Sequence, residues 1–396
     1  MERTIFNKDR IAHGANTNSK RSSCFPSNYP KTILKSTDCY AYDEKRNRLI
    51  DYICSLGVNW FGASNIEINS QVAFQLDYGS IHSLTSDLEC AMAGRISELF
   101  PFMEKVRFLK TGSEACSAAI RIARAYNGRD LLVTKGYHGW HDEFVSLTPP
   151  AKGIPPEGCL NIEELDLEDI NYSCCKETAA VVIEPVELEL NIQKLQNLRD
   201  YCTKKGIVLI YDETITAYRF PGFSVAKYTG IYPDIAILGK AIGGGLPLAV
   251  VGGKKEIMES DYFVSSTFSG DNLALAAAYK ASELIKTTEY DPKNVWEKGK
   301  IFLEKFNGIN PDIIRIKGYP TRGIFECTDL VKTVFFQEAI KAGILFGSSW
   351  FFNYHLSKET DNVIELCKVI INRIAKGEVK LEGEVIKGPF SNKFRS

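Results

Sequence analysis

The sequence lacks several features that would place a protein in a familiar class. Its formal net charge is only −1 over 396 residues, so it has no basic excess of the kind that binds nucleic acid or an anionic membrane surface. No apolar run reaches the length of a membrane-spanning helix, and the first residues are polar, unlike a signal peptide. These absences predict a cytoplasmic protein that binds neither nucleic acid nor membrane.

Metal-type cysteine spacing is also missing. The chain has 11 cysteines, but none form a CxxC pair, and the one close pair, Cys174–Cys175, is adjacent. An odd number of cysteines without a secretory signal favours reduced thiols over a disulfide framework. The sequence therefore predicts neither a zinc site built on cysteines nor a disulfide-bonded domain.

What the chain does contain is enough apolar sequence for a large α/β fold. Between residues 86 and 290, short apolar strands alternate with helices, a pattern typical of a mostly parallel sheet covered on both faces. A small β-meander is expected at 32–54. From about residue 290, expected helices at 294–309, 334–344 and 362–377 and an expected strand at 318–327 suggest a separate α+β lobe. We therefore expect an N-terminal arm and meander over 1–85, a large α/β domain over 86–290 and a small α+β domain over 291–396.

Thr111, Gly112 and Ser113 follow the apolar strand at 106–109 and begin a helix that runs to Gly128. Backbone N–H groups, two hydroxyl groups and the positive end of the helix form a phosphate-binding arrangement. Ser113 is the expected N-cap. An ordinary cap on a surface helix is the alternative interpretation.

Asp212 and Lys240 each end an apolar strand. A carboxylate such as Asp212 needs a cationic partner when it is buried, and it could keep a pyridinium nitrogen protonated; a helix cap or a salt bridge is the alternative. Lys240 is followed by AIGGG, where backbone can approach a ligand closely. An isolated lysine is usually solvated, but one desolvated in such a pocket is a nucleophilic amine that can form a Schiff base.

Tyr137 and His138 lie beside a glycine in the segment KGYHGWHDEF. These side chains could stack on a planar ring, although aromatic residues of a core or loop are common. His138, His141 and Asp142 could instead bind zinc, but no further ligand cluster is evident, and we predict no metal. A phosphate site, a pyridinium partner, a stacking aromatic residue and a Schiff-base lysine together predict a pyridoxal phosphate site.

The chain also resembles a known family over nearly its whole length, from about Gly14 to Arg395. The matching stretches are KTGSEA, YHGWHDEF, VVIEP, LIYDETITAYR, PDIAILGKAIGGGLP and STFSGDNLALAAA. In these it resembles the class-III aminotransferases among the fold-type I pyridoxal phosphate enzymes, particularly the branch that contains glutamate-1-semialdehyde aminomutase. The resemblance implies a large domain with a seven-stranded, mostly parallel sheet, and a smaller domain built from both terminal segments.

The resemblance also implies a role for each matching residue. Lys240 would carry the cofactor, pyridoxal 5′-phosphate, as a Schiff base and would move the proton, with pyridoxamine 5′-phosphate as the intermediate form. The remaining implied cofactor contacts are Asp212 with the ring nitrogen, Tyr137 and His138 with the ring, Glu184 in the pocket, and Thr111, Gly112 and Ser113 with the phosphate. Thr267 would reach the phosphate of a neighbouring subunit, which implies a homodimer with shared active sites.

The substrate-facing parts of the family pattern are less well matched. Lys20 or Arg21, in a polar arm, would contact a substrate anion, and Glu189 falls where the family has an asparagine near the ring hydroxyl. Arg219 matches a family arginine, with a structural salt bridge as the alternative. The resemblance thus implies transfer of an amino group from a small-molecule donor to a carbonyl acceptor. An intramolecular aminomutase and a catalytically idle, cofactor-binding scaffold are the alternatives.

Overall fold

A computed structural model describes residues 10–145, 162–164 and 176–388 of the chain. Its contacts divide the chain into two compact units: a terminal unit of Met1–Leu56 with Lys298–Ser396, and a central unit of Gly57–Glu297. The three-part division expected from the sequence, with boundaries after residues 85 and 290, stays a prediction.

The central unit is organised around a seven-stranded sheet in the order β4-β10-β9-β8-β7-β5-β6. Neighbours are parallel from β9 to β6, whereas β10 runs antiparallel to both β9 and β4. The expected α/β fold with a mostly parallel seven-stranded sheet is therefore confirmed. The strands are β4 (Lys105–Leu109), β5 (Leu131–Lys135), β6 (Ile162–Glu164), β7 (Thr178–Ile183), β8 (Val208–Glu213), β9 (Ile235–Leu238) and β10 (Ala249–Gly253).

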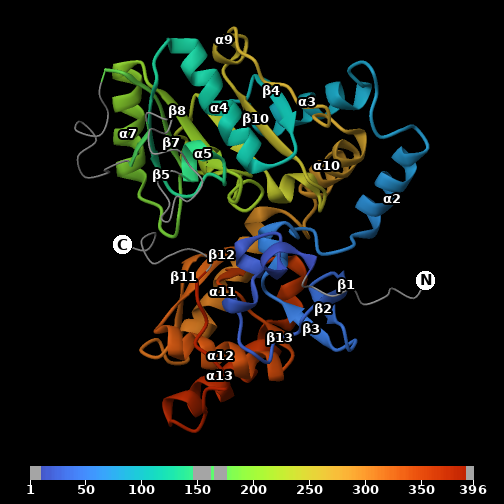
Figure 1. Cartoon of the computed structure of the whole chain (residues 1–396), viewed down its shortest axis with the longest axis vertical. Coiled ribbons are helices and arrows are strands. Elements are labelled where there is room, and N and C mark those ends of the chain that lie inside the picture. Colours follow the sequence, from blue (N-terminus) through green and yellow to red (C-terminus); the bar gives the residue numbers. More distant parts are fainter. Residues whose placement is uncertain (1–9, 146–161, 165–175, 389–396) are drawn as a thin grey trace. The chain divides into compact units, whose positions relative to one another are not determined.

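Helices precede, connect and follow these strands (Figure 1). They are α2 (Ile66–Leu76), α3 (Asp87–Leu99), α4 (Gly112–Asn127), α5 (Asp142–Val145), α7 (Ile192–Lys205), α8 (Val225–Thr229), α9 (Lys255–Met258), α10 (Asn272–Leu284) and the short 3-10 helix η5 (Lys240–Gly243). Helix α4 crosses one face of the sheet and contacts β4, β7, β8, β9 and β10. This contact fixes the start of α4 relative to the ends of the strands.

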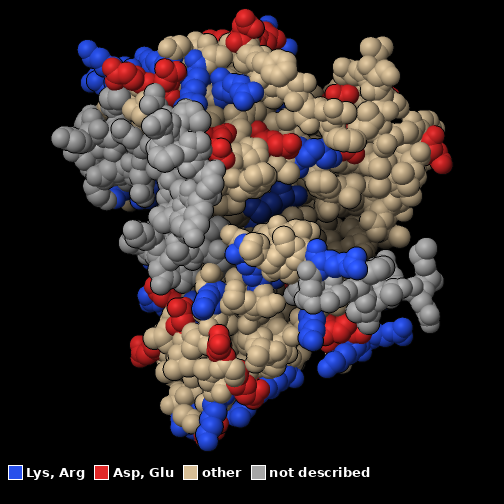
Figure 2. All heavy atoms as spheres, viewed as in Figure 1, with Lys and Arg blue, Asp and Glu red and all other residues tan. Residues whose placement is uncertain are grey.

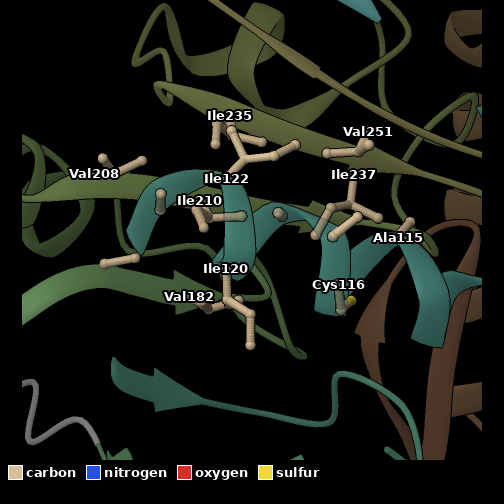
Figure 3. Close-up of a cluster of buried hydrophobic side chains, with 14 of the residues drawn as sticks. Ala115, Cys116, Ile120, Ile122, Val182, Val208, Ile210, Ile235, Ile237 and Val251 are labelled. Carbon is tan, nitrogen blue, oxygen red and sulfur yellow. The ribbon is translucent and has the colours of Figure 1, made fainter. Parts of the chain in front are cut away.

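The core between α4 and the sheet consists of aliphatic side chains. Every residue of β7, β8, β9 and β10 is buried, which explains why these strands are continuous apolar runs and not alternating ones. Figure 3 shows Ile120 and Ile122 of α4 close to Val182, Ile210 and Ile235 of the strands. Truncating one of these buried isoleucines to alanine typically costs about 2–5 kcal/mol.

The terminal unit contains the expected β-meander. Strands β1 (Ile33–Thr37), β2 (Tyr40–Asp43) and β3 (Arg48–Asp51) are antiparallel, and β13 (Ile344–Leu345) joins β3 in parallel. Its remaining elements are the short helices α1 (Cys54–Gly57), η2 (Ala12–Gly14), η3 (Asn18–Lys20), η4 (Ser22–Cys24) and η6 (Tyr354–Glu359), the strands β11 (Arg315–Tyr319), β12 (Arg322–Glu326) and β14 (Ser349–Phe351), and the helices α12 (Asp329–Lys341) and α13 (Thr360–Ala375). Helix α11 (Pro292–Asn307) spans the boundary between the units.

One expected strand of the terminal unit is wrong. The segment 318–327 is not a single strand, because Pro320 and Thr321 separate β11 from β12 in a tight antiparallel hairpin. Proline cannot donate a hydrogen bond to a ladder, so it interrupts the strand there.

Among the described residues, no helix is both long enough and apolar enough to cross a membrane. The eight cysteines of the described segments are all free thiols, while Cys174 and Cys175 lie outside those segments.

Candidate active site

A cavity of about 280 Å³ lies within the central unit, where five strands of the sheet end. Lys110 follows β4, Tyr137 follows β5, Glu184 follows β7, Asp212 belongs to the end of β8, and Lys240 follows β9. Parallel strands bring their carboxyl ends to one edge, which is where open α/β sheets bind ligands. Seven residues predicted for the site line this one cavity: Gly112, Ser113, Tyr137, His138, Glu184, Asp212 and Lys240.

The start of α4 forms one wall of the cavity. Thr111, not Ser113 as expected, is the N-cap: its hydroxyl accepts from the Glu114 N–H at 3.2 Å, and the Glu114 carboxylate accepts from the Thr111 N–H at 2.8 Å. This reciprocal arrangement is a capping box. Within the described segments, the N–H groups of Gly112 and Ser113 have no hydrogen-bond partner. Two backbone donors at the positive end of a helix therefore line the cavity.

Gly139 allows the segment after β5 to pass directly over the start of α4. Its φ is +107°, and a Cβ atom there would lie 2.3 Å from the Oγ of Ser113 and 2.8 Å from its Cα. The next residue, Trp140, donates its N–H to the Ser113 Oγ at 3.3 Å. Residues with a side chain rarely adopt such a φ and could not fit in this space. Gly139 thus holds Tyr137 and His138 against the cavity.

Asp212 and His138 form a buried pair at the floor of the cavity. The His138 Nδ1 lies 2.9 Å from the Asp212 Oδ2, and its Nε2 lies 3.0 Å from the backbone carbonyl oxygen of Lys135. Both ring nitrogens face acceptors, so the doubly protonated ring satisfies both contacts. The thiol of Cys116 lies 3.5 Å from the same carboxylate oxygen, and the Thr214 N–H donates to Oδ1 at 3.0 Å.

These contacts set the charge of the pair. Burial by itself would raise the pKa of Asp212, but the hydrogen bond and positive charge of His138 and the Thr214 N–H lower that pKa below its usual value. Burial would likewise lower the pKa of His138, but the hydrogen bond and charge of Asp212 raise it above its usual value. Asp212 is thus an ionised carboxylate at neutral pH, which is the state that can stabilise a positive charge in the cavity.

Lys240 has an unusual backbone conformation at the first residue of η5. Its φ is +48°, in the left-handed region that a residue with a side chain seldom adopts, and such strain is typical of functional positions. Gly244 ends η5 with φ +58°, and a Cβ atom there would lie 2.9 Å from the backbone oxygen of Ala277. The glycine-rich segment is therefore needed to pack η5 against α10, with Lys240 in the wall of the cavity.

Tyr137 and Glu184 line the side of the cavity. The Tyr137 N–H donates to the Glu184 Oε1 at 3.4 Å, a long hydrogen bond, and the Tyr137 side chain is partly exposed. Their contacts with a ligand ring remain predictions.

Five of the predicted residues do not line the cavity. Thr111, Thr267 and Glu189 are exposed outside it, and Lys20 and Arg21 belong to the terminal unit. Their predicted roles are not decided by these positions.

Arg219, the other family match, is fully buried beneath Trp60. Its guanidinium group donates to the backbone oxygens of Gly57 and Ile215. These contacts give Arg219 a structural role in holding the first residues of the central unit.

The two histidines that could have been zinc ligands have different hydrogen-bond partners. His138 bonds to Asp212, whereas the Nδ1 of His141 lies 2.7 Å from the Ser117 hydroxyl. Within the described segments, Cys116, His138 and Asp212 form a group whose potential ligand atoms all lie within 4.8 Å of one another. The ionised Asp212–His138 pair accounts for this closeness without a metal ion.

Three cavity-lining residues with polar or ionisable side chains were missed from the sequence: Lys110, Cys116 and Thr214. Lys110 directly precedes the predicted phosphate site, and its position next to Thr111 is a signal that could have identified it. Cys116 reaches Asp212 only through the packing of α4 on β8, so no local pattern marks it. Thr214 lies two residues after Asp212 and donates to it within the same turn, so its nearness in the sequence was a usable signal.

Comparison with known proteins gives a consistent result. Residues 25–351 match the model of the family described as Aminotransferase class-III. A glutamate-1-semialdehyde 2,1-aminomutase of Archaeoglobus fulgidus is 32% identical over 301 residues, covering 70% of this chain and 71% of that protein. The enzyme of the same name in Wigglesworthia glossinidia brevipalpis is 28% identical over 426 aligned positions, covering 92% and 97%.

A solved structure supports the fold independently. The FumI protein of Sphingopyxis sp., determined in a form with pyridoxal phosphate, has a TM-score of 0.87 to this chain at 18% identity, covering 94% of this chain and 96% of that one. At this identity, the likeness concerns the fold alone.

Proposed function

This chain belongs to the class-III aminotransferase family, and from this premise we propose that it moves an amino group between an amino donor and a carbonyl acceptor with pyridoxal 5′-phosphate. The observation that carries the proposal is the convergence of Lys240, the Asp212–His138 pair and the start of α4 in one cavity. A nucleophilic amine, a buried anion and a phosphate-binding helix end are the three groups that this cofactor needs.

The hydrogen-bonding groups of the site fit the cofactor. Its phosphate suits the N–H groups of Gly112 and Ser113, and its basic ring nitrogen suits the ionised Asp212 carboxylate. The Oγ1 of Thr214 adds a buried hydroxyl that has no hydrogen-bond partner within the described part of the chain. When bound, the cofactor supplies an aldehyde that reacts with amines and a ring that accepts electrons from the substrate carbon.

Each residue then has a defined task. Lys240 offers the amine that holds the cofactor, and its Nζ accepts and returns the proton of the substrate carbon. Asp212 keeps positive charge on the ring nitrogen, and His138 holds Asp212 ionised and oriented through Nδ1. The start of α4 binds the phosphate and so fixes the distance between the ring and Lys240.

An intramolecular aminomutase is the second candidate, and a specific observation favours it. Both curated relatives described above are glutamate-1-semialdehyde 2,1-aminomutases. The mutase reaction uses the same residues but must also retain a diamino compound in the site until it is converted. We rank transfer first because it requires only the residues that line the cavity.

A half-reaction separates the two candidates. The purified protein, loaded with cofactor, is mixed with a panel of amino donors without any acceptor, and the carbonyl product is counted against the number of sites. For the transferase we expect one carbonyl product per site, released to solution, and repeated turnover only when an acceptor is added. Conversion of glutamate-1-semialdehyde to the isomer in which its amino and carbonyl groups have exchanged places, with no product that has lost the amino group, would overturn the ranking in favour of the mutase.

We further infer that the enzyme is a homodimer in which Thr267 reaches the partner's cofactor phosphate. The segment around Thr267 is exposed in a single chain, including the apolar Phe263 and Phe268, which are 77% and 61% exposed. Figure 2 shows that the visible face over α2, α3 and α10 presents mostly uncharged residues. Exposed apolar side chains on a soluble enzyme favour burial against a second copy.

We also infer a cytoplasmic location. The inference rests on the free thiols of the described cysteines, because disulfides are typical of oxidising compartments. A periplasmic or secreted pool of the native protein, found by fractionation, would contradict it.

A further inference from the structure

Lys110 stands between the end of β4 and the start of α4, directly before the N-cap Thr111. Lys110 lines the same cavity as Gly112 and Ser113. The ammonium group forms an ion pair with the Oδ2 of Asp271. Asp271 is itself fixed, because its Oδ1 accepts from the Ala274 N–H at 3.1 Å and so caps α10. A rigid helix cap therefore holds the Lys110 charge at the wall of the cavity.

An ammonium group has three N–H donors, and the structure shows one acceptor for Lys110, the Asp271 carboxylate. Two donors thus remain for a second acceptor. The backbone N–H of Lys110 is used separately, since it donates to the Glu114 carboxylate at 3.0 Å. The side chain of Lys110 can therefore bind an anion without losing the contacts that position it.

The local charges show why such a cation is needed. Two carboxylates, Glu114 and Asp271, lie close to the phosphate-binding end of α4. The helix end contributes only about half a positive charge. A phosphate dianion bound to the N–H groups of Gly112 and Ser113 would face net repulsion if Lys110 carried no charge. Lys110 offsets this repulsion.

We propose that Lys110 is a phosphate-binding residue of this site, positioned by Asp271, and that it makes the chain select the phosphorylated over the unphosphorylated form of its cofactor. This inference rests on the proposed function, because it takes the ligand to be pyridoxal phosphate or pyridoxamine phosphate. It adds a side-chain cation to a phosphate site whose other donors are backbone N–H and hydroxyl groups.

The test compares two ligands that differ only in the phosphate. Pyridoxamine 5′-phosphate and pyridoxamine are titrated into the full-length protein, freed of cofactor, and the dissociation constants are measured from ligand fluorescence. Losing one charge-assisted hydrogen bond should weaken pyridoxamine 5′-phosphate binding by roughly 10- to 100-fold in Lys110→Met. Pyridoxamine binding should change by less than about twofold, because that ligand carries no phosphate.

Lys105→Met is the matched control. Lys105 lies at the other end of the same strand, pairs with Glu259 on the surface at 3.0 Å, and does not line the cavity. The Lys105→Met substitution removes the same positive charge from the protein, so this variant should bind both ligands with the wild-type affinities. Lys110→Gln, which keeps a polar side chain, should behave like Lys110→Met.

Three outcomes would overturn the inference, and they differ in meaning. If both Lys110 variants bind pyridoxamine 5′-phosphate as the wild type does, Lys110 is not a phosphate ligand, although the proposed function stands. An equal loss for both ligands would show that Lys110 only maintains the fold of the site. If the wild type binds neither pyridoxamine 5′-phosphate nor pyridoxal 5′-phosphate, the proposed function itself fails.

Discussion

Asp212 receives hydrogen bonds from groups that are far apart in the sequence. His138 comes from the segment after β5, Cys116 from α4 and the Thr214 N–H from the turn after β8. A buried carboxylate without such donors would be protonated at neutral pH, because burial disfavours the charge. Cooperation of three segments therefore produces the one buried anion that the proposed chemistry needs.

The His138 contact predicts a pH dependence of stability. Because the folded pKa of His138 is raised above its unfolded value of about 6.5, its stabilising contribution is complete below that pH and is lost as the pH rises through the folded pKa. Asp212 has a lowered pKa, so its contribution holds above its unfolded pKa of about 4 and is lost only as the pH falls through the folded value.

His138→Asn keeps a hydrogen-bond donor toward Asp212 but cannot titrate. Urea unfolding between pH 5 and 9 should show the wild type most stabilised over this variant near pH 5 to 6, with the difference shrinking toward pH 9; each unit by which the pKa is raised corresponds to about 1.4 kcal/mol. A difference that stays constant across this range would show that His138 is not the charged partner of Asp212.

Residues at the ends of strands were predictable because strand ends can be read from the sequence. Asp212 and Lys240 each follow a continuous apolar run, and Thr111 to Ser113 follow another, and the structure brings these segments together. The cap was assigned to the wrong residue because Thr111 and Ser113 are both good N-caps, and only the capping box with Glu114 decides between them. Lys110 and Cys116 were missed since their partners, Asp271 and Asp212, are distant in sequence.

At the level of elements, the site depends on how closely the segment after β5 crosses α4. Gly139 touches Ser113 so tightly that a single added methyl group has no room. Helix α4 is in turn fixed by its aliphatic core against the sheet (Figure 3). The position of His138 therefore follows from a backbone contact between two elements.

Gly139→Ala should destabilise the protein by about 1–3 kcal/mol, because overpacking forces either the segment or α4 to move. It should also weaken cofactor binding, since it displaces His138 and the start of α4 together. Gly94→Ala is the control: Gly94 lies within α3, has no atom within 4 Å of the added Cβ, and should gain about 0.5–1 kcal/mol. Thermal unfolding and cofactor titration of both variants measure these effects. If Gly139→Ala has the stability and cofactor affinity of the wild type, a glycine is not needed where the segment after β5 crosses α4.

Most elements could be predicted from periodicity, and the exceptions have physical causes. The helices at α3, α4, α7, α10, α12 and α13 and the buried strands of the central sheet were expected. The strand expected at 318–327 contains β12 and only the last two residues of β11, because Pro320 and Thr321 turn the chain between them. Helix α2 was not expected: its exposed Ile66, Phe74 and Leu76 blur the apolar stripe that marks a helix.

On the scale of the whole molecule, the proposal of shared active sites assigns Thr267 and Lys240 to different sites. Lys240 lines the cavity of its own chain, while Thr267 is exposed outside it. If Thr267 serves the partner's site, a Lys240 substitution on one chain and a Thr267 substitution on the other affect the same site and leave the second site of the dimer intact. A monomeric enzyme does not permit such separation.

Mixing two inactive variants tests this arrangement. Lys240→Ala and Thr267→Asp homodimers should each lose most activity, the second because a carboxylate repels the phosphate. After subunit exchange, each heterodimer carries one site with both defects and one with neither, so activity should recover to about a quarter of the wild-type value if the chains mix at random. No recovery, despite heterodimers detected by mass spectrometry, would contradict a site shared through Thr267.

Lys240 is expected to be the amine that holds the cofactor, and reductive trapping identifies this amine. The purified protein is incubated with pyridoxal 5′-phosphate, reduced with borohydride, digested, and the labelled peptide is identified by mass spectrometry. We expect one cofactor per chain, attached to Lys240, and no such label in Lys240→Ala. Labelling of another lysine in the wild type, or none at all, would contradict this expectation.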